Sequence, residues 1–131
     1  MTKKLPTIGI LGAIGVTLGA LGAHTLKTKI TPDLLHGFET AVTYHMYHLL
    51  AMLAVVILNQ TYKHKYLKWA FNFFLWGIFC FSGSLYLLCT RSLFNADWLK
   101  FLGPVTPIGG ILFITGWLFL AFSVVKKTTQ R

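Results

Sequence analysis

Four long apolar stretches, joined by short polar connections, dominate this chain of 131 residues. A helix needs roughly 20 mostly apolar residues to cross about 30 Å of hydrocarbon at 1.5 Å per residue. The four stretches meet this requirement at about residues 5–23, 38–58, 67–89 and 105–125. We therefore predict an all-α membrane protein: a four-transmembrane-helix bundle that forms a single integral membrane domain over residues 1–131.

The charge composition supports a membrane location. Only 11% of the residues are charged, whereas a soluble domain carries about a quarter. The formal charge of +9 comes from short basic clusters between apolar runs rather than from one basic stripe. This arrangement is typical of a polytopic membrane protein. We expect membrane lipids as partners, and no nucleic acid.

The distribution of Lys and Arg predicts the orientation. With the N-terminus inside, the connections on the outer side carry four basic residues, namely Lys27, Lys29, Arg91 and Lys100, together with all three acidic residues. The cytoplasmic side then carries eight: Lys3, Lys4, Lys63, Lys65, Lys68, Lys126, Lys127 and Arg131. This bias predicts cytoplasmic N- and C-termini in a bacterial-type plasma (inner) membrane.

Glycine spacing indicates close helix packing. The first apolar stretch would also fit a cleaved signal peptide, because Lys3 and Lys4 precede it and small residues follow near Ala23. Glycines three and four residues apart on one face favour a retained helix, since small residues let two helices approach closely in lipid. The predicted packing glycines are Gly12, Gly15, Gly19 and Gly22 in the first span and Gly109, Gly110 and Gly116 in the fourth.

Local signals shape the spans and their connections. Thr31-Pro32-Asp33 predicts a helix start near Pro32, with a capping Thr, a first-turn Pro and an acid. Ser82-Gly83-Ser84 predicts a bend in the third span. Between the third and fourth spans, one helical face carries Phe94, Trp98, Phe101 and Leu102. We expect either a short interfacial helix there or a loop with aromatic anchors.

Polar side chains gather in the outer half of the predicted bundle, whereas its inner half is almost wholly apolar. Polar groups at membrane depth are costly, so they are usually paired or functional. The candidate polar cluster comprises His24, His36, Glu39, Thr43, Tyr44, His45, Tyr47, His48, Ser82, Ser84, Tyr86, Arg91 and Thr106. Its members can serve as interhelical hydrogen bonds worth about 1 kcal/mol each, or they can bind a solute or relay protons.

Glu39 is the only carboxylate inside a predicted span. We expect it to face the bundle and to accept a hydrogen bond from His24, His36, Arg91 or a backbone N–H, because a paired carboxylate is tolerated at this depth. The alternative is a solvated residue at the rim of the membrane.

The sequence offers no catalytic, metal or redox constellation. His45 and His48 share a helical face, but Glu39 points elsewhere and no second Glu-x-x-His occurs, so we expect no metal site. Cys80 and Cys89 lie about 13 Å apart along one helix and cannot pair. No nucleophile elbow, phosphate loop or dinucleotide motif is present. We therefore expect a protein that is not an enzyme and needs no cofactor.

Several short motifs occur in a fixed order along the whole chain. They are Gly19-Ala20-Leu21-Gly22-Ala23-His24, Phe38-Glu39-Thr40-Ala41-Val42 with Tyr44 and Met46-Tyr47-His48, Phe81-Ser82-Gly83-Ser84-Leu85-Tyr86, and Thr106-Pro107-Ile108-Gly109-Gly110 with Gly116-Trp117. Together they resemble the family called domain of unknown function 423, which includes transmembrane protein 256. The resemblance implies a small four-span membrane protein without an established activity. The family commonly has Gln where this chain has His45, which argues against a metal role for that residue.

Two functions remain open at this point. The first is a non-catalytic packing or accessory protein that forms a homo-oligomer or joins a larger membrane complex through its glycine faces. The second is a carrier or binding protein that takes a small solute, lipid or proton in the outer polar cluster. A water-filled cavity between the second and third spans would favour the carrier, and a fully packed bundle would count against it.

Overall fold

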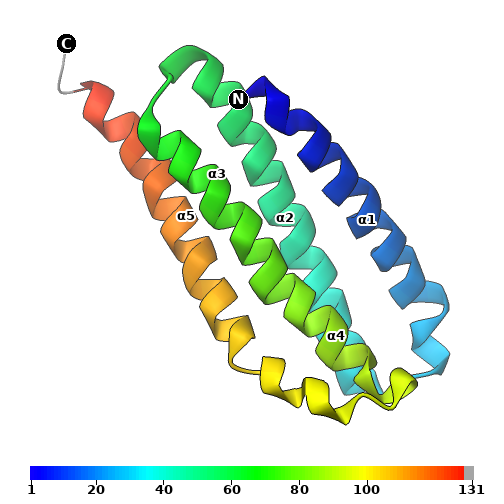
Figure 1. Cartoon of the computed structure of the whole chain (residues 1–131). Coiled ribbons are helices and arrows are strands. Elements are labelled where there is room, and N and C mark those ends of the chain that lie inside the picture. Colours follow the sequence, from blue (N-terminus) through cyan, green and yellow to red (C-terminus); the bar gives the residue numbers. More distant parts are fainter. Residues whose placement is uncertain (129–131) are drawn as a thin grey trace.

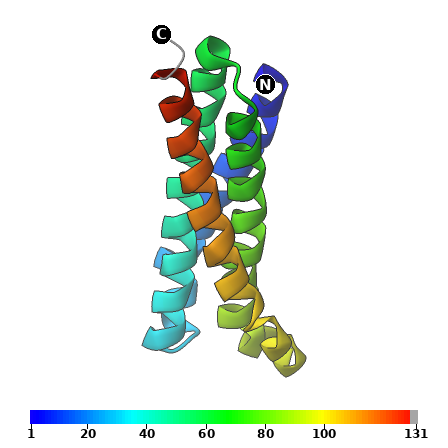
Figure 2. The same cartoon turned by 90° about the vertical axis from the view of Figure 1, so that its left-hand side faces the viewer.

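The computed structural model describes the backbone of residues 1–128 and the side chains of residues 1–123, and over this range it contains helices only (Figures 1 and 2). In chain order the elements are η1 (Thr2–Lys4), α1 (Leu5–His24), η2 (Leu26–Thr28), α2 (Pro32–Tyr62), α3 (Lys65–Gly77), η3 (Ile78–Gly83), α4 (Ser84–Thr90), η4 (Arg91–Phe94), η5 (Asp97–Leu102) and α5 (Val105–Thr128). Of the basic residues assigned to the cytoplasmic side, the side chains of Lys126 and Lys127 and all of Arg131 lie outside the described residues.

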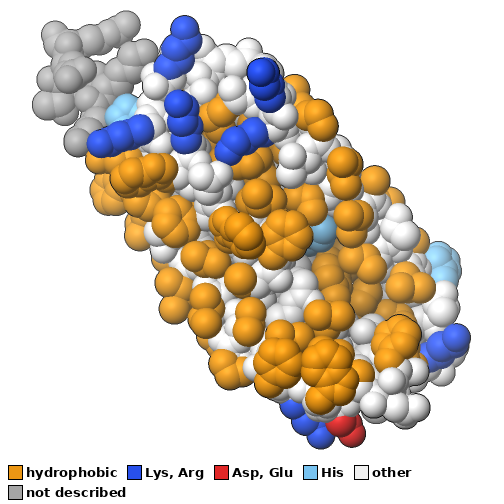
Figure 3. All heavy atoms as spheres, viewed as in Figure 1, with side chains coloured by type: hydrophobic (Ala, Val, Ile, Leu, Met, Phe, Trp, Pro, Cys, Tyr) orange, Lys and Arg blue, Asp and Glu red, His pale blue; other side chains and the backbone are white. Residues whose placement is uncertain are grey.

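Four helical segments are long and apolar enough to cross a membrane: Thr2–Thr28, Pro32–Tyr62, Lys65–Phe94 and Asp97–Ser123. The prediction of an all-α, four-span bundle is confirmed. In the face shown in Figure 3, apolar side chains cover the middle of the molecule, and Lys and Arg gather mainly at one end. That end holds the α2–α3 connection and is called here the Lys63 end. The opposite end, with η4 and η5, is the Asp97 end.

The local signals for α2 are realised in the structure. The Leu34 N–H donates to the Thr31 hydroxyl over 3.5 Å, Pro32 opens the helix and Asp33 lies in its first turn. The helix ends before Lys63, which adopts a left-handed conformation with φ 45°. With 31 residues, α2 is about 46 Å long. It is therefore longer than the hydrocarbon core is thick, and it is the longest of the described helices.

The helices are arranged around α2 and α3. Helix α1 packs against α2, which also contacts α3, η3 and α4, while α5 packs mainly against α3 and η3 (Figure 1). The apolar core fills the α2–α3 contact and the Lys63-end half of the bundle. Its most deeply buried side chains are Met52, Val55, Val56, Leu67, Phe71 and Phe74. Helix α1 thus lies at the edge of the bundle, with α2 as its main neighbour.

All four predicted packing glycines of α1 lie against α2. A Cβ atom added to Gly12, Gly15, Gly19 or Gly22 would come within 3.4 Å of an α2 side chain. The tightest case is Gly15, where the added atom would stand 2.7 Å from the Met46 sulfur. This glycine face is therefore used inside the chain and is not available for contact with another molecule.

The glycines of α5 differ from one another. A Cβ on Gly109 would overlap the backbone nitrogen of Phe81, so α5 touches the backbone of η3 directly. A Cβ on Gly116 would stand 2.7 Å from the side-chain ring of Phe74. Gly110, in contrast, has open space where a Cβ would lie. Within the described part of the chain, Gly110 therefore makes no close helix contact.

The third span is not one continuous α-helix. Residues Ile78–Gly83 form a π-helical turn between α3 and α4, at the Ser82-Gly83-Ser84 site where a bend is predicted. The aromatic connection that follows forms two short 3₁₀ helices, joined at Asn95 with φ 50°, instead of a single interfacial helix. Phe94, Trp98 and Phe101 are exposed there, as anchoring aromatic side chains at a membrane surface would be.

Candidate functional site

A belt of polar side chains links α2, η3, α4 and α5 in the half of the bundle nearer the Asp97 end. We call this set the polar belt, and its members are His45, His48, Ser82, Ser84, Tyr86, Thr106 and Trp117. Six of the seven belong to the cluster expected from the sequence. Each forms at least one hydrogen bond to another helix.

His45 joins three helices at the centre of the bundle. Its Nδ1 atom lies 3.1 Å from the Tyr86 hydroxyl on α4. The opposite ring edge faces α1, because Cδ2 and Cε1, the two neighbours of Nε2, each lie 3.6 Å from the Cβ position of Gly15. A side chain at Gly15 would occupy the space of this ring. The glycine therefore lets a buried imidazole fit between α1 and α2.

His48 connects α2 with α5. The Trp117 indole N–H donates to its Nε2 over 3.2 Å, and its Nδ1 lies 2.7 Å from the Tyr44 carbonyl oxygen. Indole nitrogen only donates and a carbonyl only accepts. Nε2 is therefore the acceptor, and the proton is on Nδ1. The ring also stacks on Phe113, with centroids 3.5 Å apart. His48 is thus a neutral imidazole whose two nitrogens are both engaged.

Two serines of the π-helical region complete the belt. The Ser82 hydroxyl donates to the Ala41 carbonyl of α2 over 2.7 Å, and Ser82 is fully buried. The Ser84 and Thr106 hydroxyls lie 2.6 Å apart and tie α4 to α5. The π-helical turn accounts for these contacts, since an extra residue in the turn changes which side chains face α2 and α5.

Seven members of the predicted cluster lie outside the belt, namely His24, His36, Glu39, Thr43, Tyr44, Tyr47 and Arg91. His24, His36 and Glu39 are exposed, and among the described residues their side chains form no hydrogen bond or ion pair. The predicted contact of the Glu39 carboxylate is therefore wrong, because the side chain is exposed on α2 and no described residue partners it. Thr43 is also exposed, and its hydroxyl donates to the Glu39 carbonyl within its own helix.

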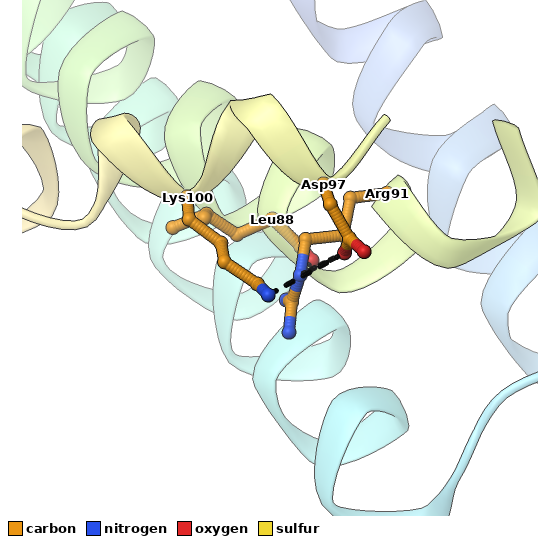
Figure 4. Close-up of polar contacts among 4 residues, drawn as sticks. All are labelled: Leu88, Arg91, Asp97 and Lys100. Atoms are coloured by element: carbon orange, nitrogen blue, oxygen red, sulfur yellow. Dashed lines mark hydrogen bonds and ion pairs between the residues drawn. The ribbon is translucent and has the colours of Figure 1, made fainter. Parts of the chain in front are cut away.

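Arg91 pairs with a residue that the sequence did not suggest. Its side chain donates to the Leu88 carbonyl over 2.6 Å and lies 3.9 Å from the Asp97 carboxylate, which also pairs with Lys100 (Figure 4). The Asp97 side chain is 79% exposed, and exposed ion pairs contribute about 0–1 kcal/mol. This group fastens η4 to η5 at the Asp97 end rather than joining the belt. The expectation that Arg91 meets Glu39 is wrong.

A groove of about 670 Å³ lies between α2 and α5 beside His48. Its lining residues are Tyr44, Tyr47, His48, Leu50, Phe81, Gly110, Phe113, Ile114 and Trp117. The open space at Gly110 forms part of it. Tyr47 also lines the groove. It is 63% exposed and is not a member of the belt.

The arrangement does not favour a metal at the two histidines. His45 faces Tyr86 and α1, whereas His48 faces Trp117 and Phe113, so the rings do not converge on one point. Among the described residues, no three His, Cys, Asp or Glu side chains lie close enough to hold an ion. Cys80 and Cys89 are free thiols on one span.

The fold and the belt define a small, four-span helical membrane protein. The chain belongs to the family described as protein of unknown function DUF423, whose model matches residues 18–110. The family resemblance of the motifs is confirmed. Neither the family description nor the relatives' names state an activity.

Relatives of nearly full length are found in several bacteria. A UPF0382 membrane protein of Staphylococcus saprophyticus is 40% identical over 121 residues, which cover 89% of this chain and 95% of the relative. UPF0382 membrane protein YwdK of Bacillus subtilis is 38% identical over 89% of this chain and 94% of its own. A UPF0382 membrane protein of Haemophilus influenzae is 36% identical over 95% of each. No solved structure matches the chain.

Trp117 is the belt residue that sequence reasoning missed. It lies in an apolar span, where an aromatic side chain is ordinarily assigned to packing or lipid contact. One chemical signal in the sequence could have identified Trp117. An indole N–H in hydrocarbon needs an acceptor, and the imidazoles of α2 are acceptors at membrane depth.

Proposed function

We propose that this protein is a non-catalytic membrane subunit that associates with a second copy of itself through the outward face of α1. The observation that carries the proposal is a second row of small residues on α1. Gly9, Ala13, Thr17 and Ala20 are all exposed, and they lie about 135° around the helix from the glycines that contact α2. Helix α1 therefore presents small residues on two faces, only one of which is covered within the chain.

The outward row suits helix association in lipid. Small residues four positions apart allow two backbones to approach closely, and packing then replaces the hydrophobic effect that is absent between lipid-covered helices. The Thr17 hydroxyl donates to the Ala13 carbonyl over 2.8 Å, so this polar group is satisfied before any partner arrives. No described residue from another helix comes within 4 Å of the Cβ position of Gly9.

A second copy is the simplest occupant of this face. Two copies share one orientation in the membrane, so their α1 helices run parallel and a two-fold axis along the membrane normal brings each row onto itself. The edge position of α1, with α2 as its main neighbour, leaves room for this contact. A different helix of a larger complex would use the same surface.

The belt supports a structural rather than a transporting role. Nδ1 of His45, Nε2 of His48 and the hydroxyls of Ser82 and Ser84 are engaged by other helices of the same chain. Interhelical bonds of this kind average about 0.6 kcal/mol in a membrane protein. The remaining half of the bundle is filled by apolar side chains such as Met52 and Phe74, so the belt does not continue across the membrane.

Cysteine crosslinking tests the dimer directly. In a Cys80→Ser, Cys89→Ala background, Ala13→Cys is expected to give a dimer with a short bismaleimide in native membranes. Ala121→Cys is the matched control, because Ala121 is an exposed alanine on α5. Equal crosslinking at both positions, or none at Ala13, contradicts the proposed contact. If Ala13→Cys crosslinks only to a different protein, this face contacts a partner in a larger complex instead of a second copy.

The groove between α2 and α5 supports a second candidate function, the binding of a lipid, small solute or proton. Proteoliposomes that contain a pH-sensitive dye test the proton case. Our proposal expects no flux above that of empty liposomes. Flux that is present in the wild type and lost in His48→Phe would establish a carrier in place of the structural subunit.

The bacterial plasma membrane, with both termini in the cytoplasm, is the location that we propose. The bacterial relatives named as membrane proteins and the basic Lys63 end support it, because Lys and Arg favour the cytoplasmic side. A reporter fused to the C-terminus, active only in the cytoplasm or only outside it, checks this orientation.

A further inference from the structure

A second pocket, separate from the polar belt and the α1 face, lies at the Lys63 end of the bundle. It has a volume of about 360 Å³ and is lined by Met1, Thr2, Asn59, Gln60, Lys63 and Lys68. These residues come from the start of the first span, the end of α2 and the first turn of α3. The pocket therefore lies where three spans begin or end, which is the depth of lipid headgroups.

The pocket carries positive charge that no ion pair among the described residues neutralises. Lys63 and Lys68 line it, and Lys4 lies close enough to Lys68 for electrostatic repulsion. Lys4 is held in place by a 3.0 Å hydrogen bond to Asn72 and by the Phe71 ring, 4.0 Å away. The three acidic residues of the sequence, Asp33, Glu39 and Asp97, all lie toward the opposite end of the bundle. None of the described residues supplies the pocket with an anionic partner, so the lysines are free to bind an anion there.

Lys63 occupies a backbone position that lysine rarely adopts. It follows α2 with φ 45° and ψ 35°, a left-handed conformation that costs a non-glycine residue about 1–2 kcal/mol. Glycine or asparagine is the usual residue there. Lysine raises the free energy of the backbone at this position, but it places an ammonium group at the pocket.

Asn59 adds a second recognition element. Its Oδ1 atom is buried and has no hydrogen-bond partner among the described residues. A carbonyl oxygen only accepts, so it does not bind a phosphate oxygen. It requires a donor such as a hydroxyl. The pocket thus offers two lysines to an anionic group. Asn59 can add one acceptor for a neighbouring hydroxyl once its side chain turns toward the pocket, because Oδ1 is enclosed in the observed position.

We infer that this pocket binds the headgroup of an anionic glycerophospholipid whose phosphodiester is followed by a hydroxylated group, as in phosphatidylglycerol. The phosphodiester lies between Lys63 and Lys68, and a headgroup hydroxyl donates to Asn59 Oδ1. The pocket has room for about twelve water-sized groups, which matches a headgroup and leaves the acyl chains in the surrounding bilayer. A lipid is also the anion present at this depth at the highest concentration.

Three lipids and inorganic phosphate separate the contributions. The full-length protein is reconstituted in phosphatidylcholine nanodiscs that contain phosphatidylglycerol, phosphatidylethanol or no anionic lipid, and bound lipid is counted by native mass spectrometry. Phosphatidylethanol has the same charge but no headgroup hydroxyl. Phosphatidylglycerol is expected to bind most tightly. The Lys63→Gln, Lys68→Gln double variant is expected to lose about 25-fold in affinity, from about five-fold per lysine.

Matched variants exclude general charge effects. Lys27→Gln, Lys29→Gln removes two exposed charges at the opposite end and is expected to leave binding unchanged. Asn59→Leu is expected to reduce phosphatidylglycerol binding to the level of phosphatidylethanol without affecting the latter. Circular dichroism of each variant confirms that it is folded.

Specific outcomes contradict the inference. Equal losses in the two double-lysine variants would show general attraction to an anionic surface. Equal binding of the two anionic lipids to the wild type would show that Asn59 does not recognise a headgroup hydroxyl. Thermal stabilisation by inorganic phosphate as large as that by phosphatidylglycerol would identify a free phosphate site instead of a lipid site.

Discussion

Gly109 and Gly110 provide a matched pair of substitutions that tests the packing of α5. In Gly109→Ala the new methyl group would overlap the Phe81 nitrogen and stand 2.7 Å from its Cα, whereas in Gly110→Ala it meets nothing within 4 Å. Backbone atoms cannot rotate away as a side chain would. Because ordinary contact begins near 3.4 Å, α5 and η3 have to separate by about 1 Å.

The expected cost has two sources. Overpacking costs about 1–3 kcal/mol, and the separation stretches the 2.6 Å contact between Ser84 and Thr106, an interhelical bond worth about 0.6 kcal/mol. Both variants gain the same helix propensity, up to about 1 kcal/mol, so this gain cancels between them. Gly109→Ala is therefore expected to be less stable than Gly110→Ala by about 2–4 kcal/mol.

Unfolding in mixed micelles with increasing SDS, followed by far-ultraviolet circular dichroism, measures this difference. Gly110→Ala is expected to unfold at the wild-type midpoint or slightly above it. Gly109→Ala is expected to unfold at a clearly lower SDS fraction. Equal midpoints for the two variants would refute the close backbone contact between α5 and η3.

Three further substitutions test the belt and the rim by the same unfolding assay. Tyr86→Phe removes the hydrogen bond to His45 and is expected to lower the free energy of unfolding by about 1 kcal/mol; an unchanged value contradicts a stabilising role. Ser82→Ala removes the bond to the Ala41 carbonyl and is expected to cost about 1–2 kcal/mol, because the acceptor stays buried. Glu39→Gln is expected to change stability by less than about 0.5 kcal/mol, and a larger loss would show that the carboxylate has a partner.

The sequence was sufficient to predict the spans and the inner glycine face. Four apolar runs of the required length leave few alternatives in a bilayer. The spacing of Gly12, Gly15, Gly19 and Gly22 identifies the close contact because three- and four-residue steps define one side of a helix. The start of α2 was equally accessible, since Thr31 and Pro32 act locally.

The polar belt was predictable only in part. Depth along each span follows from residue number, so His45, Ser82 and Tyr86 were correctly expected at one level of the bundle. The hydrogen-bond partners of these side chains could not be predicted, because they depend on the rotation of each helix about its axis. The π-helical turn at 78–83 changes that rotation within a span, and nothing in the residue pattern gives its length.

Glu39 shows where the depth argument fails. The prediction assumed that a carboxylate in an apolar run must face the bundle. In the structure the side chain is exposed on α2, which begins at Pro32 and extends beyond the apolar core of the span. A residue seven positions from the start of a helix about 46 Å long lies near the membrane surface. At this depth a carboxylate can extend toward water, so the sequence does not require a partner for it within the bundle.

Subunit counting in a bilayer tests the association through α1 most directly. The protein carries one fluorophore per chain and is reconstituted at low density, and single-molecule photobleaching steps are counted for the wild type, Ala13→Ile and Ala121→Ile. Two-step bleaching is expected for the wild type and for Ala121→Ile, whose added bulk lies on α5. Ala13→Ile is expected to bleach in one step, because the larger side chain separates the two α1 helices. One-step bleaching of the wild type, or two-step bleaching of Ala13→Ile, contradicts association through this face.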